Sequence, residues 1–155
     1  MKFSHMVEEN GPNEYPIEQI KEDIESVGVR RFIFKTDQEP AIVALRERVI
    51  EALGKKCEVL DEESPVGDHQ ANGAEEQGVR LAQGYARTLL AAVAQELGME
   101  DVPETSPLIP LAVRHGAWLY TRIAVRPDGK TAWEGIRGKP FRGALAEFGE
   151  KILYL

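Results

Sequence analysis

The stretch VRRFIFKTDQEPAIVALRERVIEALGKKCEVLDEE, residues 29–63, decides the fold. Its opening, VRRFIFKT, is rich in Val, Phe and Ile and predicts a buried strand. Residues 39–53 carry apolar side chains at helical spacing, and Gly54 follows as a stop signal. CEVLDEE predicts a second strand. A helix between two strands is the crossover that parallel strands need, so we expect a partly parallel sheet.

Other segments with clear patterns flank this stretch. FSHMV, residues 3–7, predicts a short strand or the remnant of one, and residues 17–27 predict a helix. Residues 74–97 predict a long helix, and residues 107–124 predict another. The Gly-rich tail ends in KILYL, residues 151–155, for which we expect a strand. This order of helices and strands indicates the α/β class.

The composition limits the classes of protein to consider. A chain of 155 residues suits one domain with one core. Its single cysteine, Cys57, excludes an internal disulfide and fits a reducing compartment. No apolar stretch is long enough to span a membrane, and the N-terminus lacks the apolar region of a signal peptide. We therefore expect an intracellular protein without membrane partners.

The charge is unevenly distributed along the chain. The net charge of −7 argues against a general nucleic-acid coat. Residues 1–100 carry a net charge of −9, whereas residues 111–143 hold seven basic and two acidic side chains, a net charge of +5. A basic segment on an acidic body can bind polyanions locally, and a solvated surface is the alternative. Trp118 and Trp133 are expected in the core, and a base-stacking platform is the alternative for Trp133, which lies amid basic residues and glycines.

Asp37 stands where the first strand of this stretch ends and the next helix begins. In open α/β sheets, ligands gather at the carboxyl ends of strands. Asp is also a favoured N-cap residue, and Glu39 lies in the first turn, where the helix dipole favours acids. Taken alone, Asp37 can therefore be a helix cap or a ligand of a metal ion.

The helix expected at residues 74–97 has two different faces. One face, at steps of four, three and four, consists of Glu76, Arg80, Gln83 and Arg87. The opposite, packing face consists of Leu81, Tyr85, Leu89 and Ala92. Such a face can act on a DNA phosphodiester, because the carboxylate helps to hold Mg²⁺ at the reacting phosphate and the Arg side chains bind neighbouring phosphates. The alternative is a solvated helix with an ordinary Glu–Arg pair four residues apart.

The sequence around these acids resembles a retroviral-type integrase core, and more narrowly the integrases of copia-type retrotransposons. The similar pieces are KTDQ at 35–38 and SPVGDHQANGAEE at 64–76, with 38 residues between Asp37 and Glu76. The C-terminal GKTAWEGIRGKP and LAEFGEKILYL are similar to the end of that core. The resemblance extends from about Phe3 to Leu155.

The resemblance implies a ribonuclease H-like fold, a mixed sheet flanked by helices, over a single domain at 1–155 that lacks the first two strands. It implies DNA strand transfer and 3′-end processing, with Mg²⁺ or Mn²⁺ as the cofactor and no small-molecule cofactor. Asp37 and Glu76 would be catalytic and metal-binding acids. The side chains implied to bind DNA are His69, Asn72, Arg80, Gln83 and Arg87.

The chain departs from the family in three respects: the first acid is missing, Gln38 and Glu39 replace the family's Asn-Gly or Gly-Gly after Asp37, and Glu75 adjoins Glu76. No Asp precedes FSHMV to serve as the first of three acids, so we expect the chain to be inactive alone. Without the first strands, the strand that ends at Asp37 would have an exposed edge. We expect that FSHMV covers this edge, that a second chain does so in a homo-oligomer, or that the domain is marginally stable. Glu75 adjoins Glu76, and the helical face favours Glu76 as the inward acid.

An alternative of a different class is a non-catalytic α/β module, derived from an integrase, that binds nucleic acid or protein. Other chemistry finds little support. His5, His69 and His115 lack metal-ligand spacing with Cys57. The sequence has no Gly-rich phosphate loop and no Ser or Cys nucleophile motif. The expected location is the nucleus or cytoplasm, as part of a retroelement polyprotein.

Overall fold

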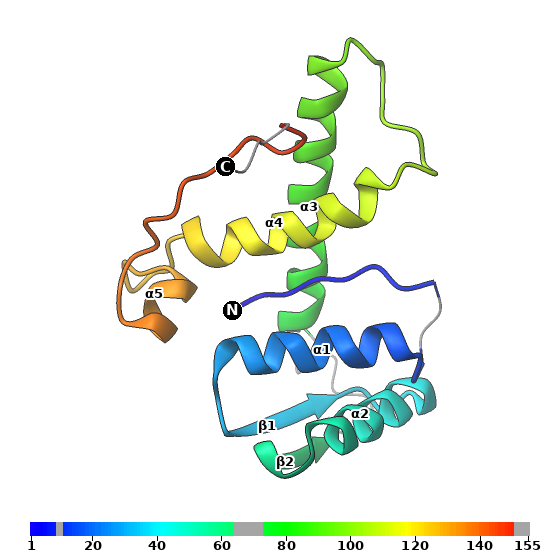
Figure 1. Cartoon of the computed structure of the whole chain (residues 1–155), viewed down its shortest axis with the longest axis vertical. Helices are drawn as coiled ribbons and strands as arrows, with labels where there is room; N and C mark the ends of the chain where they lie inside the picture. Colours follow the sequence, from blue (N-terminus) through cyan, green and yellow to red (C-terminus); the bar gives the residue numbers. More distant parts are fainter. Residues whose placement is uncertain (9–10, 64–72, 151–155) are drawn as a thin grey trace, which may run out of the picture. The chain divides into compact units, whose positions relative to one another are not determined.

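The computed structural model describes residues 1–8, 11–63 and 73–150 (Figure 1). The chain divides into two compact units. We call His5–Ala74 the sheet unit, and Met1–Ser4 together with Glu75–Leu155 the helical unit. The described residues combine helices with a two-stranded sheet, which confirms the predicted α/β class.

The sheet unit contains the strand–helix–strand pattern expected at residues 29–63. Its elements are α1 (Glu14–Val27), β1 (Arg31–Thr36), α2 (Pro40–Leu53), the short 3-10 helix η1 (Gly54–Lys56) and β2 (Glu58–Glu63). The two strands pair in parallel, with Arg31 opposite Glu58 and Thr36 opposite Glu63. α2 is the crossover between them, so the predicted parallel pairing is confirmed.

Local sequence signals set the ends of the two helices in this unit. Pro40 occupies the first turn of α2, where its missing N–H costs no hydrogen bond. Gly28 follows α1 in a left-handed conformation with φ of 79°, and its N–H donates to the carbonyls of Ile24 and Glu25. These ends fix the short connections that bring α1 and α2 back against the strands.

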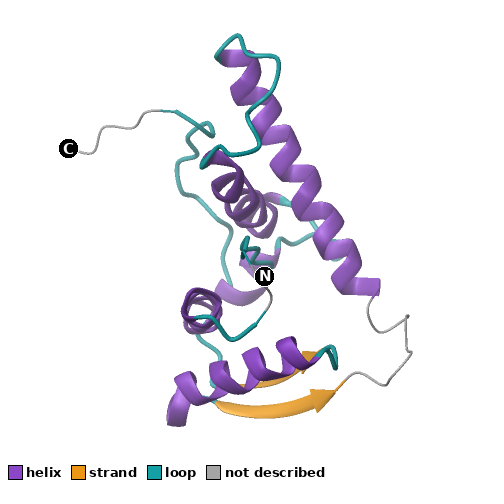
Figure 2. Ribbon diagram, turned by 90° about the vertical axis from the view of Figure 1, so that its right-hand side faces the viewer, coloured by secondary structure: helices purple, strands orange, loops and turns teal. Residues whose placement is uncertain are grey.

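The core of the sheet unit lies between the helices and one face of the sheet. Figure 2 shows both helices on the same side of the two strands. Exposure alternates along β1, because Phe32 and Phe34 face the helices and Ile33 faces away. The buried centre consists of Ile17, Val49 and Leu53. The half-buried side chains packed around it are Ile20, Ile24, Phe32, Phe34, Leu45, Cys57 and Val59.

The other face of the sheet is exposed and ordered in three rows. Ile33 lies opposite Leu60, and these side chains remain 57% and 43% exposed. A charged pair flanks this apolar row on each side. Their shortest nitrogen–oxygen distances are 3.5 Å for Arg31–Glu58 and 3.6 Å for Lys35–Glu62. The cations all stand on β1 and the acids on β2.

The strand expected at residues 3–7 is wrong, since this segment forms no strand. A side-chain contact holds part of it instead. His5 Nε2 lies 2.7 Å from Asp23 Oδ2 of α1, and both side chains are largely buried. The segment therefore packs on a helix, and FSHMV does not cover an edge of the described sheet.

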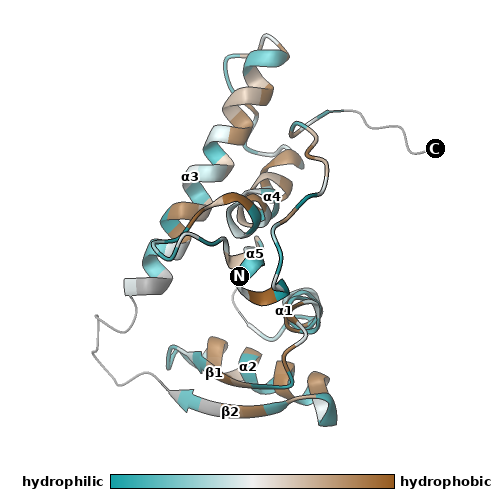
Figure 3. Cartoon of the chain, turned by 90° about the vertical axis from the view of Figure 1, so that its left-hand side faces the viewer, coloured by the Kyte–Doolittle hydropathy of each residue, from teal (hydrophilic) through white to brown (hydrophobic). Residues whose placement is uncertain are grey.

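The helical unit contains α3 (Gly73–Glu96), α4 (Leu108–Ile123) and α5 (Ala132–Arg137). The first two match the helices expected at 74–97 and 107–124 within about two residues, and α5 was not predicted. The strand expected at 151–155 lies outside the described residues. Figure 3 shows polar and apolar segments alternating along α3, as in an amphipathic helix. No helix within the described ranges is long and apolar enough to cross a bilayer.

The two long helices of this unit approach closely at Gly116. A Cβ atom at this position would lie 2.7 Å from Cβ of Tyr85, closer than two carbon atoms can approach. Glycine therefore permits the crossing. The rings of Tyr85 and Tyr120 then meet edge to face, with centroids 5.9 Å apart, and Ala86 and Ala117 are buried nearby in sequence.

The N-terminal residues of the helical unit attach to α4 through one hydroxyl. Thr121 is only 1% exposed. Its Oγ1 accepts a hydrogen bond from the Lys2 N–H at 2.9 Å and donates one to the Lys2 carbonyl at 3.0 Å. Because the buried hydroxyl both donates and accepts a hydrogen bond, it is fully satisfied, and its burial costs little stability.

Candidate nucleic-acid interface

Asp37 directly follows β1 and is exposed at the carboxyl end of this strand, where the sequence predicts it. The N-cap residue of α2 is Glu39, whose side chain makes no capping hydrogen bond. Asp37 lies two residues before this position, so its interpretation as the N-cap is wrong. It is a carboxylate at a strand end, the position where α/β proteins commonly bind ligands.

The polar face of α3 is exposed as predicted. Its members are Glu76, Arg80, Gln83 and Arg87. Glu76 Oε2 lies 3.6 Å from Arg80 Nη2, and these side chains are 62% and 81% exposed. A pair this open to water contributes little to stability. The cations of this face therefore remain accessible to a polyanion.

Three sequence predictions for the start of α3 lie beyond the structural description. His69 and Asn72 belong to residues 64–72, which are outside the described residues. The side chain of Glu75 is not described either. The assignment of Glu76 as the acid of this helix rests on its place on the face of Arg80 and Arg87.

A divalent ion would need oxygen ligands, and the chain offers carboxylates of the right kind. Asp37 lies in the sheet unit and Glu76 in the helical unit. Both are exposed, and Mg²⁺ commonly takes one or two carboxylates and completes its shell with water and phosphate oxygens. Over residues 1–8, 11–63 and 73–150, no three or more His, Cys, Asp or Glu side chains gather as a metal-binding group. Each acid, taken by itself, is thus of the chemical type that Mg²⁺ or Mn²⁺ accepts as a ligand.

A row of aromatic rings, which the sequence did not predict, joins α4 to α5 and the tail. We call it the aromatic row: Phe148, His115, Trp118, Phe141 and Trp133. Neighbouring ring centroids along it are 5.4 to 5.5 Å apart. His115 stacks on Trp118, whereas Phe141 meets both indoles edge to face. Burial lowers the pKa of His115. The row attaches the Gly-rich tail to the helices.

Arg122 lies against both tryptophans of this row. Its guanidinium carbon is 4.0 Å from the Trp118 ring centroid and 4.6 Å from that of Trp133. Nη1 donates to the Trp118 carbonyl at 3.2 Å, whereas the buried Nε has no partner among the described residues. Burial, and secondly the charge of Arg137, lowers the pKa of Arg122. Contact with two indoles stabilises this cation where water is partly excluded.

The missed helix α5 does have a sequence signal. Residues 131–134 read TAWE, which is the pattern of a capping box. Thr131 Oγ1 accepts a hydrogen bond from the Glu134 N–H at 3.1 Å. The turn before it follows the Pro-Asp-Gly signal, with the Arg126 N–H donating to the Lys130 carbonyl at 2.9 Å. The positions of Arg122 and Phe141 against Trp133 depend on this turn and helix, and no local motif marks them.

Comparison with known proteins adds no relative to these observations. No family model, curated protein or solved structure matches the chain. The function has to be inferred from the residues themselves.

Proposed function

We propose that this chain is part of an integrase-type core of ribonuclease H-like fold that acts on DNA in strand transfer and 3′-end processing. The similarity of residues 35–38 and 64–76 to copia-type integrases supports the proposal. The structural observation that carries it is the exposed face of α3, where Arg80, Gln83 and Arg87 follow Glu76. The proposed setting is a retroelement polyprotein in the nucleus or cytoplasm, as a homo-oligomer.

In this proposal the residues of the chain have two roles. Asp37 and Glu76 supply carboxylate oxygens to the metal ion. A Mg²⁺ or Mn²⁺ ion held by these acids would supply Lewis-acid stabilisation of the attacking and leaving oxygens of a phosphodiester. Arg80 and Arg87 bind neighbouring phosphates, and the Gln83 amide can donate or accept a hydrogen bond. Because only two of the three family acids have counterparts here, we expect no activity from the chain alone.

Metal and DNA titration of acid variants tests the proposal. We expect Asp37→Asn and Glu76→Gln each to weaken Mn²⁺ binding at least about tenfold in calorimetry, because each removes a ligand oxygen. We also expect them to reduce the Mn²⁺-dependent part of duplex DNA binding. Glu47→Gln is the matched control, since Glu47 is an exposed acid of α2.

The proposal fails if Mn²⁺ and DNA bind both acid variants as well as the parent chain. That result would favour the alternative, a non-catalytic α/β module. Equal weakening by Glu47→Gln would show that Mn²⁺ responds to net charge rather than to a site. Crystals grown with Mn²⁺ would identify the ligand atoms directly.

A further inference from the structure

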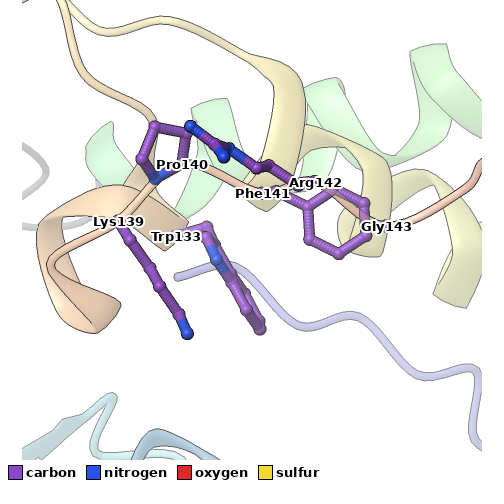
Figure 4. A pocket seen from close by; sticks show the side chains of 6 residues that line it. All are labelled: Trp133, Lys139, Pro140, Phe141, Arg142 and Gly143. Atoms are coloured by element: carbon purple, nitrogen blue, oxygen red, sulfur yellow. The ribbon is translucent and has the colours of Figure 1, made fainter.

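A pocket of about 590 Å³ opens where α5 meets the segment that follows it. Its lining consists of Trp133, Lys139, Pro140, Phe141, Arg142 and Gly143. Figure 4 shows the side chains of Trp133 and Lys139 extending alongside each other, with the Phe141 ring on the other side of Trp133 from Lys139. The volume is in the range of small-ligand sites, about 300 to 1,000 Å³. We call it the Trp133 pocket.

The charge around the Trp133 pocket is strongly positive. Lys139 and Arg142 are exposed and form no ion pair or hydrogen bond with any residue that the structure describes. The guanidinium carbons of Arg122 and Arg137 lie 4.6 and 5.3 Å from the Trp133 ring centroid. From residue 132 to residue 143, Glu134 is the single acid of the sequence. Two cations thus line the pocket, and two more lie against its indole.

An aromatic wall beside the exposed cations Lys139 and Arg142 sets the chemistry of the ligand. An inorganic anion would contact the cations and gain nothing from the indole. An apolar ligand would contact the rings and gain nothing from Lys139 and Arg142. A planar ring joined to an anionic group uses both, because stacking on an aromatic side chain and contact with Lys or Arg are separate favourable terms.

We propose that the Trp133 pocket holds one unpaired nucleotide of a single-stranded nucleic acid. The base packs against Trp133, and the flanking phosphates contact Lys139 and Arg142. The strand must be single because duplex bases are already stacked on each other and do not offer a face to a side chain. This site is separate in sequence from Asp37, Glu76 and the face of α3, so it does not rest on the proposed metal chemistry.

Tryptophan fluorescence reports directly on this contact. The chain has two tryptophans, so Trp118→Phe leaves Trp133 as the single indole. We expect oligo(dT) of about eight nucleotides to quench this fluorescence to saturation, and duplex DNA of equal length to quench it less. An oligo(rU) arm distinguishes RNA from DNA as the source of the nucleotide, and inorganic phosphate tests for anion binding alone.

Variants that reverse the charge of Lys139 and Arg142 then test whether oligo(dT) binds at the Trp133 pocket. We expect Lys139→Glu with Arg142→Glu to weaken oligo(dT) binding about tenfold or more and to reduce its salt dependence, because two phosphate contacts are lost. Arg30→Glu with Lys55→Glu is the matched control, with the same change in net charge on exposed residues of the sheet unit. We expect this control to change the affinity less than about threefold, through general attraction alone.

Three results would overturn the site: no quenching of Trp133, quenching by phosphate alone, or equal losses from the two charge pairs. If Trp118→Phe does not fold, anisotropy of labelled oligo(dT) measures the same charge variants in the parent chain. In buffer without divalent metal, Asp37→Asn and Glu76→Gln should bind oligo(dT) as the parent does. Failure of the metal site and failure of the Trp133 pocket are therefore separate outcomes.

Discussion

The two units of this chain place their large and charged side chains in opposite ways. The sheet unit buries branched aliphatic side chains, Ile17, Val49 and Leu53, and neutralises cations on its open sheet face with acids opposite them. The helical unit buries mainly small residues, such as Ala86 and Ala117, and keeps its large rings half-buried. Arg80 and Arg126 of this unit pair with exposed acids four and two residues away, whereas Arg122 lies on aromatic rings and forms no ion pair with any described residue.

This difference between the units indicates where a polyanion can bind without first breaking an ion pair. A cation paired with an acid must give up that partner before it binds a phosphate. Arg122 lies on aromatic rings and forms no ion pair with any described residue, so it has no anionic partner to lose. This contrast makes the helical unit the side of the protein that we expect to contact nucleic acid, although the chain as a whole is acidic.

The largest expected effect tests the aliphatic core of the sheet unit. Leu53 is 1% exposed, and Leu53→Ala should lower the free energy of unfolding by about 2 to 5 kcal/mol, because it leaves a cavity. Urea denaturation followed by far-UV circular dichroism measures it. Leu60→Ala is the matched control on the exposed sheet face. Equal losses in the two variants would contradict the assignment of Val49 and Leu53 to the core.

A smaller effect tests the aromatic–cation contacts of the helical unit. Arg122→Lys should lower the free energy of unfolding by about 1 kcal/mol, because an ammonium group cannot lie flat against two indoles as a guanidinium does. Thermal unfolding monitored by tryptophan fluorescence measures the loss. Arg114→Lys, on an exposed position of α4, should change nothing. An unchanged Arg122→Lys would mean that only the positive charge matters.

The smallest effect is a pH dependence in the aromatic row. Burial lowers the pKa of His115 below its ordinary value of 6.5, so the folded protein binds the proton less readily than the unfolded chain. The free energy of unfolding is therefore not reduced by His115 above about pH 6.5, where the ring is neutral in both states. It falls as the pH drops below this value, because the unfolded chain then binds the proton more readily. Denaturation midpoints at pH 7.5 and 5.5 measure it. His115→Phe keeps the ring and should show a smaller difference; an identical difference would assign the titration to other groups.

Predictions from the sequence worked best where one periodicity dominates. The strands at 31–36 and 58–63 and the helix between them follow from apolar patterning and from Pro40 and Gly54. The exposed face of α3 follows from helical spacing alone. The strand prediction for FSHMV was wrong because a five-residue segment carries little periodic signal. The contact of His5 with Asp23 holds part of this segment against α1 instead.

The aromatic row could not be read from the sequence because its members come from three segments. His115 and Phe148 are 33 positions apart, and nothing local indicates that their rings meet. Arg122 looks like an ordinary exposed helix residue until α5 and Phe141 surround it. α5 itself had a capping signal in TAWE, which the surrounding glycines obscured. Tertiary packing, not propensity, forms this site.

Gly116 has an effect well beyond its own position. Because no methyl group separates the two backbones there, α3 can present Tyr85 to α4 without displacing it. That contact fixes which face of α3 packs against α4. Arg80 and Arg87 lie on the opposite face of α3. Because Gly116 has only a hydrogen atom as its side chain, α3 can pack in this orientation, and this orientation directs Arg80 and Arg87 away from α4.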